Sequence, residues 1–253
     1  MKIVRYQDGP GAKWGAVEEK QVREMEGDPF AEFRPSPRTR SMESVRLLAP
    51  CLPSKIVALG LNYRDHAAEV KLPVPTEPLL FLKPSTSVIG PGEPIVRPGM
   101  SRRVDFEAEL AVVIGKRAKA VSEERAAEYI LGYTCLNDVT ARDLQPKEGQ
   151  WTLSKSFDTF APIGPWIVTD LDPQGLEISS FLNGQRRQHS NTKNLIFGPL
   201  HLVSYVSRVM TLLPGDVIAT GTPSGIGPMA AGDTVEIVIE GIGALSNPVV
   251  SES

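Results

Sequence analysis

The sequence predicts a mainly β protein with a few helices, because three observations agree. The chain has 253 residues, of which 41% are hydrophobic, and this is enough to bury the core of one large domain. Its 22 prolines and 22 glycines indicate many turns. Strand-like segments outnumber helical ones and do not alternate regularly with them, so a mixed, mostly β domain is expected rather than a doubly wound parallel sheet.

The first 50 residues differ from the rest and are predicted to form a small N-terminal β subdomain, followed by a catalytic domain over residues 51–253. Segments 2–7 and 13–25 are typical of strands, and the turn DGPG separates them. The segment FRPSPRTRS, residues 33–41, carries charge and two prolines, and it is predicted to be an extended linker.

The larger domain is predicted to contain several strands and three helices. A short helix is expected over residues 63–70, and a second over 122–130, where Ser122 could cap acids in the first turn. Strands are expected over residues 55–62, 77–90, 92–98, 132–138 and 162–169, from 217 into a glycine-rich loop that ends at 227, and over 233–243. Apolar residues spaced by three and four predict an amphipathic third helix, which carries Leu202, Val203, Val206, Val209, Met210 and Leu213.

Composition excludes several classes of partner. The net charge of -3 gives no general attraction to nucleic acid or to an anionic membrane. No run of about 18 apolar residues could span a bilayer, and the start MKIVRYQDG lacks the apolar core of a signal peptide. Cys51 and Cys135 are isolated and fit no metal or redox spacing. A cytoplasmic protein with reduced thiols is expected, and an anionic substrate would need local positive charge.

The segment RVDFEAELAVVIG, residues 103–115, places three carboxylates before an apolar run. In a strand, Asp105, Glu107 and Glu109 would share one face, about 7 Å apart between alternate residues. Such a face is unfavourable unless it is solvated, which is the more common case, or holds a cation. Because the apolar run indicates a buried strand, carboxylates at its start are also placed where Mg²⁺ binds oxygen ligands. Asp138, at the end of another strand, could be a third ligand or equally a turn cap.

Histidine and lysine offer candidate catalytic groups. His66 and Glu69 lie three apart on the first predicted helix, so the carboxylate could orient the imidazole as a base, although a surface pair is the more frequent arrangement. His189 and His201 have no such partner in the sequence. Lys155 lies among small polar residues, where a solvated charge is usual. The loop TGTPSGIG, residues 220–227, could cradle a carboxylate with its N–H groups, but it lacks the pattern of a phosphate loop.

The order of these motifs along the chain is more specific than any one of them. Over roughly residues 53–248 the sequence resembles the fumarylacetoacetate hydrolase family. Within that family it is most similar to the bacterial branch of 2-hydroxyhepta-2,4-diene-1,7-dioate isomerases, 5-oxopent-3-ene-1,2,5-tricarboxylate decarboxylases and acylpyruvate hydrolases. The motifs that carry the resemblance are LGLNYRDHAAE, KPSTSVIGPGEPI, DFEAELAVVIGKRA, GYTCLNDVTARDLQ, SKSFDTFAPIGPWIV, LNGQ and PGDVIATGTPSGIG.

This resemblance implies a mixed β-sandwich roll around a divalent metal, Mg²⁺ or Mn²⁺, in a homodimer. It assigns the metal ligands to Glu107, Glu109 and Asp138, with Asp105 as a neighbour. It assigns catalysis to His66, Glu69 and Lys155. Substrate binding would fall to Arg142, Gln145 and Thr222.

The implied substrates are small 2-oxo or 2-hydroxy-enol di- or tricarboxylic acids that react through a metal-bound enolate. Isomerisation or decarboxylation of the 2-hydroxyhepta-2,4-diene-1,7-dioate type, in 4-hydroxyphenylacetate breakdown, is the first expectation. Acylpyruvate hydrolysis or oxaloacetate decarboxylation is the alternative, and a catalytically silent metal-binding protein is a further one.

Overall fold

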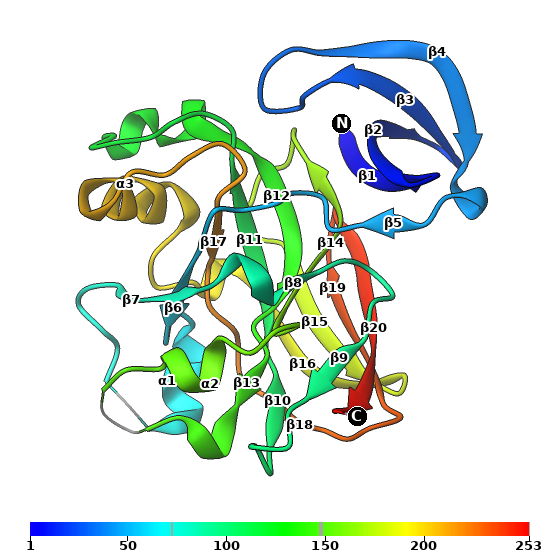
Figure 1. The fold of residues 1–253 in the computed structure, drawn as a ribbon. Coiled ribbons are helices and arrows are strands. Elements are labelled where there is room, and N and C mark those ends of the chain that lie inside the picture. Colours follow the sequence, from blue (N-terminus) through cyan, green and yellow to red (C-terminus); the bar gives the residue numbers. More distant parts are fainter. Residues whose placement is uncertain (72, 147–148, 253) are drawn as a thin grey trace.

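The computed structural model describes residues 1–71, 73–146 and 149–252, and most of their regular structure is strand (Figure 1). In this part of the chain the strands form a twelve-stranded, a five-stranded and a three-stranded sheet. The predicted mainly β fold with few helices is therefore confirmed. Within the same residues, no helix combines the length and the apolar character needed to cross a membrane.

The large sheet runs through both the N-terminal segment and the rest of the chain. Its spatial order is β4 (Phe33–Ser41), β3 (Gln21–Gly27), β2 (Gly11–Glu18), β1 (Lys2–Asp8), β14 (Ala161–Val168), β12 (Ile130–Asn137), β11 (Ala108–Ile114), β17 (Val217–Ala219), β6 (Ile56–Gly60) and β7 (Leu79–Lys83). Off this path, β5 (Leu47–Leu48) pairs with β1 and β8 (Val88–Ile89) pairs with β14.

The two smaller sheets and the helices complete the domain. The five-stranded sheet has the order β16 (Gln185–Asn191), β15 (Glu177–Leu182), β19 (Thr234–Ile239), β20 (Gly243–Ser251) and β9 (Ile95–Arg97). The three-stranded sheet consists of β13 (Thr140–Ala141), β10 (Val104–Phe106) and β18 (Gly227–Met229). The α-helices are α1 (Arg64–Val70), α2 (Thr152–Lys155) and α3 (Pro199–Val209), and the 3₁₀ helices are η1 (Met42–Ser44), η2 (Ser85–Ser87), η3 (Glu123–Tyr129), η4 (Arg142–Leu144) and η5 (Thr192–Asn194).

Strand β11 lies at the centre of the core and is buried along its whole length. Its side chains alternate between two faces. Leu110 and Val112 belong to the core shared with the five-stranded sheet, whereas Ala111 and Val113 pack into a second core with Ile163 of β14. A strand buried on both faces is expected to be a continuous apolar run, and this explains the sequence LAVVI. The strand is therefore a rigid base for the acidic residues that precede and begin it.

The N-terminal segment extends the large sheet, because β1 pairs antiparallel with β14. Figure 1 shows β1–β4 as a blue lobe that continues beyond the main body. The predicted strand over residues 13–25 is in fact two strands, β2 and β3. The predicted linker over residues 33–41 is wrong, because these residues form β4 at the edge of the sheet. An edge strand tolerates Pro35 and Pro37, since one side of it needs no ladder hydrogen bonds. The division at residue 50 remains a prediction.

The acidic segment departs from the continuous strand that its sequence predicts. The strand is interrupted at Glu107, so that β10 lies in the three-stranded sheet and β11 in the large one. The reason lies in Asn137, whose side-chain oxygen accepts the Glu107 N–H at 2.9 Å. The Glu107 carbonyl in turn accepts the Asp138 N–H at 2.9 Å. The interruption lets Glu107 and Asp138 meet between the two sheets.

Two helices were predicted from capping and periodicity, with different outcomes. The predicted helix near Ser122 is the 3₁₀ helix η3, and the Ser122 side chain makes no capping hydrogen bond. Helix α3 confirms the first half of the apolar stripe by burying Leu202, Val203 and Val206, and it begins with Pro199 in its first turn, where the missing N–H is tolerated. The second half is wrong, because the helix ends at Val209, which is exposed, so that Met210 and Leu213 lie beyond it.

Candidate metal centre and active site

Three buried carboxylates converge at the junction of β10, β11 and β12. Oxygen atoms of Glu107, Glu109 and Asp138 all lie within 4.8 Å of one another. Glu107 is the linking residue between β10 and β11, Glu109 is on β11, and Asp138 directly follows β12. The antiparallel register pairs Ala108 with Asn137 and so brings the neighbouring acidic residues together. The structure thus brings together the three residues to which the resemblance of the sequence assigns a metal.

Two buried lysines contact this triad. Lys155 Nζ, from α2, lies 2.9 Å from Glu107 Oε2 and 2.5 Å from Asp138 Oδ2. Lys83 donates to the other oxygen of Asp138 and, at 3.1 Å, to the Val139 carbonyl. Lys155 is 2% exposed, so the usual solvated position of a lysine does not apply. Sequence reasoning missed Lys83, although a single charged residue that ends the apolar strand LLFLK was a usable signal.

The electrostatics of the triad are uneven. Burial alone would raise the pKa of Glu107, but the charges of Lys155 and Arg142 outweigh it and lower that pKa to about 2. Burial raises the pKa of Glu109 well above its usual value, and the negative charges of Asp138 and Glu107 raise it further. Burial also lowers the pKa of Lys83, and the attraction of Asp138 only partly offsets this.

Glu109 shows why a cation fits this donor set. Its carboxylate accepts the Gly221 N–H at 2.8 Å, and no lysine, arginine or histidine among the described residues forms an ion pair with it. A buried carboxylate without a cationic partner is costly. Three carboxylate oxygens are the hard donors that Mg²⁺ or Mn²⁺ prefers. The residues present therefore match a divalent metal.

Asp105 serves a different purpose from its two acidic neighbours. It is fully buried, and it accepts hydrogen bonds from Arg103 at 2.8 and 3.1 Å and from Arg142 Nε at 2.9 Å. Arg142 uses its remaining nitrogens to contact Glu107 and Gln145. Of the three alternating acidic residues, Glu107 and Glu109 are therefore metal-ligand candidates, whereas the third, Asp105, binds two arginines.

A small cavity of about 140 Å³ opens beside the triad. Of the predicted site residues, those that line it are His66, Glu107, Arg142, Gln145, Lys155 and Thr222. The wall is completed by Leu59, Gly60, Leu61, Phe81 and Trp151. Phe81 and Trp151 meet edge to face with ring centroids 5.3 Å apart, and Lys155 Nζ lies 5.0 Å from the Phe81 ring centroid. Cationic, imidazole and hydroxyl groups thus share one partly apolar chamber of a size that suits a small acid.

The predicted pair of His66 and Glu69 forms on α1. His66 Nδ1 lies 2.9 Å from Glu69 Oε2, and Glu69 Oε1 accepts the Gly225 N–H at 3.1 Å. The loop 220–227 therefore does bind carboxylates, but they are those of Glu109 and Glu69. Gly221 is needed for this, because its φ is +93° and a Cβ would lie 2.8 Å from Asn62 Cβ. Glu69 does not line the cavity, but it contacts His66, which does.

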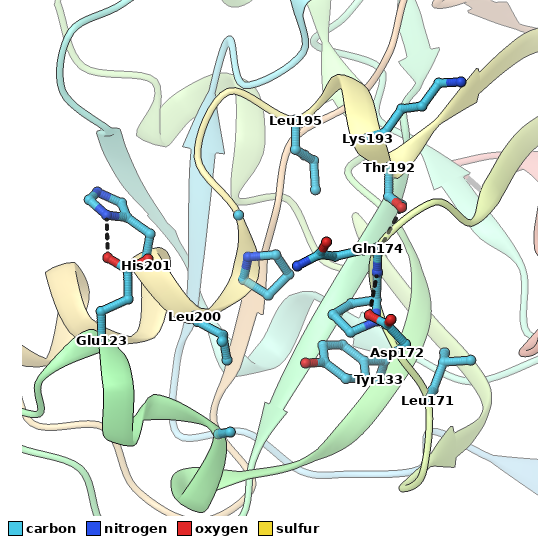
Figure 2. A pocket seen from close by; sticks show the side chains of 14 residues that line it. Glu123, Tyr133, Leu171, Asp172, Gln174, Thr192, Lys193, Leu195, Leu200 and His201 are labelled. Carbon is cyan, nitrogen blue, oxygen red and sulfur yellow. Dashed lines mark hydrogen bonds and ion pairs between the residues drawn. The ribbon is translucent and has the colours of Figure 1, made fainter.

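A larger cavity of about 540 Å³ shares no lining residue with the first. Figure 2 shows His201 and Glu123 at one side of it, where His201 Nδ1 lies 3.0 Å from Glu123 Oε2. The expectation that His201 has no carboxylate partner is therefore wrong, since Glu123 is distant in sequence. This cavity has two aspartate or glutamate residues in its wall, Glu123 and Asp172, and lies apart from the acidic triad. The candidate catalytic and substrate-binding residues thus gather at the smaller cavity.

The fold and the site define a β-rich protein with a candidate divalent-metal centre beside a chamber for a small anion. Comparison with known proteins gives the family. Residues 55–250 match the model described as fumarylacetoacetate (FAA) hydrolase C-terminal, and residues 1–50 match the one described as Rv2993c-like, N-terminal. The chain belongs to the fumarylacetoacetate hydrolase family.

Several solved structures resemble the whole chain. A 5-carboxymethyl-2-hydroxymuconate delta-isomerase from Mycobacterium smegmatis is 48% identical with a TM-score of 0.93, and all of both chains is covered. A 2-hydroxyhepta-2,4-diene-1,7-dioate isomerase from Mycobacterium marinum is 45% identical with a TM-score of 0.93, covering 100% of this chain and 99% of that one. A maleylpyruvate hydrolase from Sphingobium sp. SYK-6, in complex with manganese(II) and pyruvate, is 31% identical with a TM-score of 0.84 and full coverage of both chains.

Proposed function

We propose that this protein is a divalent-metal-dependent enzyme that acts on small 2-oxo or 2-hydroxy-enol di- or tricarboxylic acids. The observation that carries the proposal is the convergence of Glu107, Glu109 and Asp138 beside a cavity that also holds Lys155 and His66. Isomerisation of a 2-hydroxyhepta-2,4-diene-1,7-dioate type of substrate, or its decarboxylating counterpart, is the first candidate reaction. The full-length similarity to two isomerases supports this choice.

The metal would be held by the three carboxylates, and when bound it would supply a Lewis acid for the negative charge that develops on substrate oxygens. Mg²⁺ and Mn²⁺ both match this donor set, and a manganese-containing relative supports the class of ion. The positive charges of Lys155 and Arg142 would favour entry of an anionic substrate into the chamber.

The chain's own residues have distinct tasks in this mechanism. Arg142, Gln145 and Thr222 would hold the substrate carboxylates and so orient the reacting bond. Lys155 would donate a hydrogen bond to the oxygen on which negative charge develops. His66 has Nδ1 directed at Glu69, so its Nε2 is the atom that would accept and return the proton.

A metal-dependent turnover assay tests the proposal. Metal-free protein would be mixed with 2-hydroxyhepta-2,4-diene-1,7-dioate, acetylpyruvate or oxaloacetate, with and without Mg²⁺ or Mn²⁺, while ultraviolet absorbance is followed and products are identified by NMR. We expect metal-dependent conversion of the first substrate. The His66→Ala variant should still bind Mn²⁺ but turn over about 10² times more slowly or worse. No metal-dependent change with any of the three acids would favour a catalytically silent metal-binding protein.

A second candidate is hydrolysis of a carbon–carbon bond in an acylpyruvate. The relative that is a maleylpyruvate hydrolase supports it, and a His66 Nε2 directed at water could activate that water for attack on a carbonyl. The same assay separates the candidates, because hydrolysis would release pyruvate together with a second carboxylic acid, isomerisation would conserve the carbon chain, and decarboxylation would release only CO₂.

We also propose that the protein is a homodimer, as the resemblance of its sequence to this family implies. Sedimentation equilibrium of the full chain would give twice the 27.5 kDa chain mass. A single species with the mass of one chain at micromolar concentration would contradict the proposal.

A further inference from the structure

Gln188 is a buried amide that joins three parts of the candidate site. It lies on β16 with none of its surface exposed. Its Nε2 donates to Thr222 Oγ1 and to the Pro223 carbonyl, both at 2.8 Å. Its Oε1 accepts the N–H of Ala108, the residue between the two glutamates of the triad, at 3.0 Å. The family-based assignment of site residues does not include Gln188.

The backbone partners fix which way this amide faces. The Ala108 N–H can only donate, so it requires the amide oxygen. The Pro223 carbonyl can only accept, so it requires the amide nitrogen. With the amide held in this orientation, the second N–H points at Thr222 Oγ1, and the Thr222 hydroxyl must act as an acceptor toward Gln188.

The Thr222 hydroxyl proton is consequently left without a partner. In the described part of the chain, Thr222 Oγ1 donates to no other group, and Thr222 lines the small cavity. A hydroxyl whose lone pair is engaged by Gln188 and whose proton is free is a donor available to the chamber that Thr222 lines. An incoming carboxylate accepts such a bond, and because the acceptor is charged the bond is stronger than a neutral one.

We propose that Gln188 is a positioning residue that holds the Thr222 hydroxyl as a hydrogen-bond donor toward the carboxylate of the bound acid. The inference rests on the proposed function, because the acid is the small anionic substrate class assigned to this cavity. It adds a residue that acts through Thr222 and gives Thr222 a defined direction of donation. A simple bridge between β16 and the acidic segment would need only the Ala108 and Pro223 contacts.

A double-mutant cycle separates positioning from bridging. Oxalate binding to the Mn²⁺-loaded protein would be measured by calorimetry for wild type, Thr222→Val, Gln188→Met and the double variant. Thr222→Val should weaken oxalate binding about tenfold or more, because it removes a hydrogen bond to a charged group. Gln188→Met should weaken it roughly three- to tenfold. In the Thr222→Val background, Gln188→Met should change the affinity less than about twofold, because residues that act through one another are not additive.

Two outcomes would overturn the inference: oxalate affinity in Gln188→Met equal to that of wild type, or losses that multiply in the double variant. Thr222→Ser, which keeps the hydroxyl, should retain most of the affinity and its sensitivity to Gln188→Met. Mn²⁺ affinity and thermal midpoints, measured on the same samples, show whether the metal centre and the fold survive. If Gln188→Met does not fold, the neutral variant Gln188→Ala replaces it in the cycle with the same criteria.

The proposed function can fail separately from this inference. A wild-type protein that binds oxalate but converts none of the tested acids would contradict the proposed reaction and leave the cycle valid. A Mn²⁺-loaded wild type that binds no oxalate would overturn the role assigned to Gln188.

Discussion

Two clusters of charged side chains contain the same kinds of groups in opposite surroundings. On the N-terminal strands, Lys13 pairs with Asp8 at 2.8 Å and with Glu24 at 3.1 Å, while Arg40 pairs with Asp8 at 2.8 Å. At the candidate site, Lys155 similarly bridges Glu107 and Asp138. The Lys13 side chain is 34% exposed, whereas that of Lys155 is 3% exposed.

The comparison shows how burial changes the contribution of an ion pair to stability. In the N-terminal cluster, water and salt reach Lys13, Arg40 and Asp8, although Glu24 is buried, and partly exposed pairs of this kind contribute less to stability. In the buried cluster, each charge has lost its hydration and depends on its neighbours, so removing one partner is expensive. A buried set of ion pairs of this kind contributes little net stability to the fold. Its presence is better explained by the binding and chemistry that it would support.

The largest expected effect is that of replacing Lys155. Lys155→Met removes the cation between Glu107 and Asp138 and should destabilise the metal-free protein by about 3 kcal/mol, at the low end for a broken buried pair. The low end applies because Lys83 still pairs with Asp138 and Arg142 with Glu107. Urea unfolding would measure it. Lys13→Met is the comparison variant and should cost clearly less, because Lys13 is partly exposed, Asp8 keeps Arg40 and Glu24 keeps Arg38 at 3.8 Å. Equal losses in both variants would contradict the comparison.

The next effect concerns the carboxylate that has no cationic partner. Glu109→Gln keeps the shape of the side chain but removes its charge, and should weaken Mn²⁺ binding by roughly 100-fold or more, beyond the usual loss for an outer-shell change. The thermal midpoint of the metal-free variant should be equal to or above that of wild type, because glutamine is neutral at every pH and avoids the cost of burying an ionised carboxylate. Calorimetry and thermal melts check both points. Unchanged Mn²⁺ affinity would exclude Glu109 from the ligand set.

Metal binding should also depend on pH in a defined direction. The pKa of Glu109 is raised by burial and by Asp138 and Glu107, so its carboxyl group is protonated in the metal-free protein at pH values below that raised pKa. A metal takes the ionised form and releases the proton. Mn²⁺ affinity should therefore rise with pH, by up to about tenfold per pH unit for one proton, until the raised pKa is passed. Identical binding enthalpies in buffers of different ionisation enthalpy would show that no proton is released.

A smaller effect is expected at the anchor of Arg142. Asp105→Asn keeps the side-chain size but loses the charge that faces both Arg103 and Arg142. Arg142 should then be less well oriented, raising the KM for a carboxylate substrate by several-fold to about tenfold while kcat changes less. Steady-state kinetics, with whichever substrate the enzyme converts, would measure the separate changes in KM and kcat. An effect on kcat alone would place Asp105 in the chemistry instead.

Much of this site could be predicted because its signals are local. The alternating acids before LAVVI, the pair of His66 and Glu69, and the order of the motifs are all patterns within short segments. The charge that ends LLFLK is a local signal for Lys83, but the contacts of Lys83 and Gln188 could not be found in this way, because they meet Asp138 and Ala108 across 55 and 80 residues. Only the folded sheets bring them to the site.

The errors in the predicted fold have a similar origin. Proline and charge in residues 33–41 indicate a linker by local rules, but the edge position that makes β4 possible is a property of the whole sheet. The continuous acidic strand fails because the Asn137 side chain takes the Glu107 N–H. In each case a tertiary contact overrides a correct local preference.

The smallest expected effect belongs to the N-terminal cluster. The pKa of Asp8 is lowered, chiefly by its hydrogen bond to Lys13 and then by the charge of Arg40. A lowered carboxyl pKa stabilises the fold above the unfolded value of about 3.8, and this contribution is lost as pH falls through the folded pKa. Because the group is partly exposed, Asp8→Asn should lower the thermal midpoint only slightly at neutral pH, and the difference should shrink in 1 M salt as screening increases. Differential scanning calorimetry at low and high salt would measure it. A loss comparable to that of Lys155→Met, or one insensitive to salt, would mean that the N-terminal cluster is as dependent on its partners as the buried one.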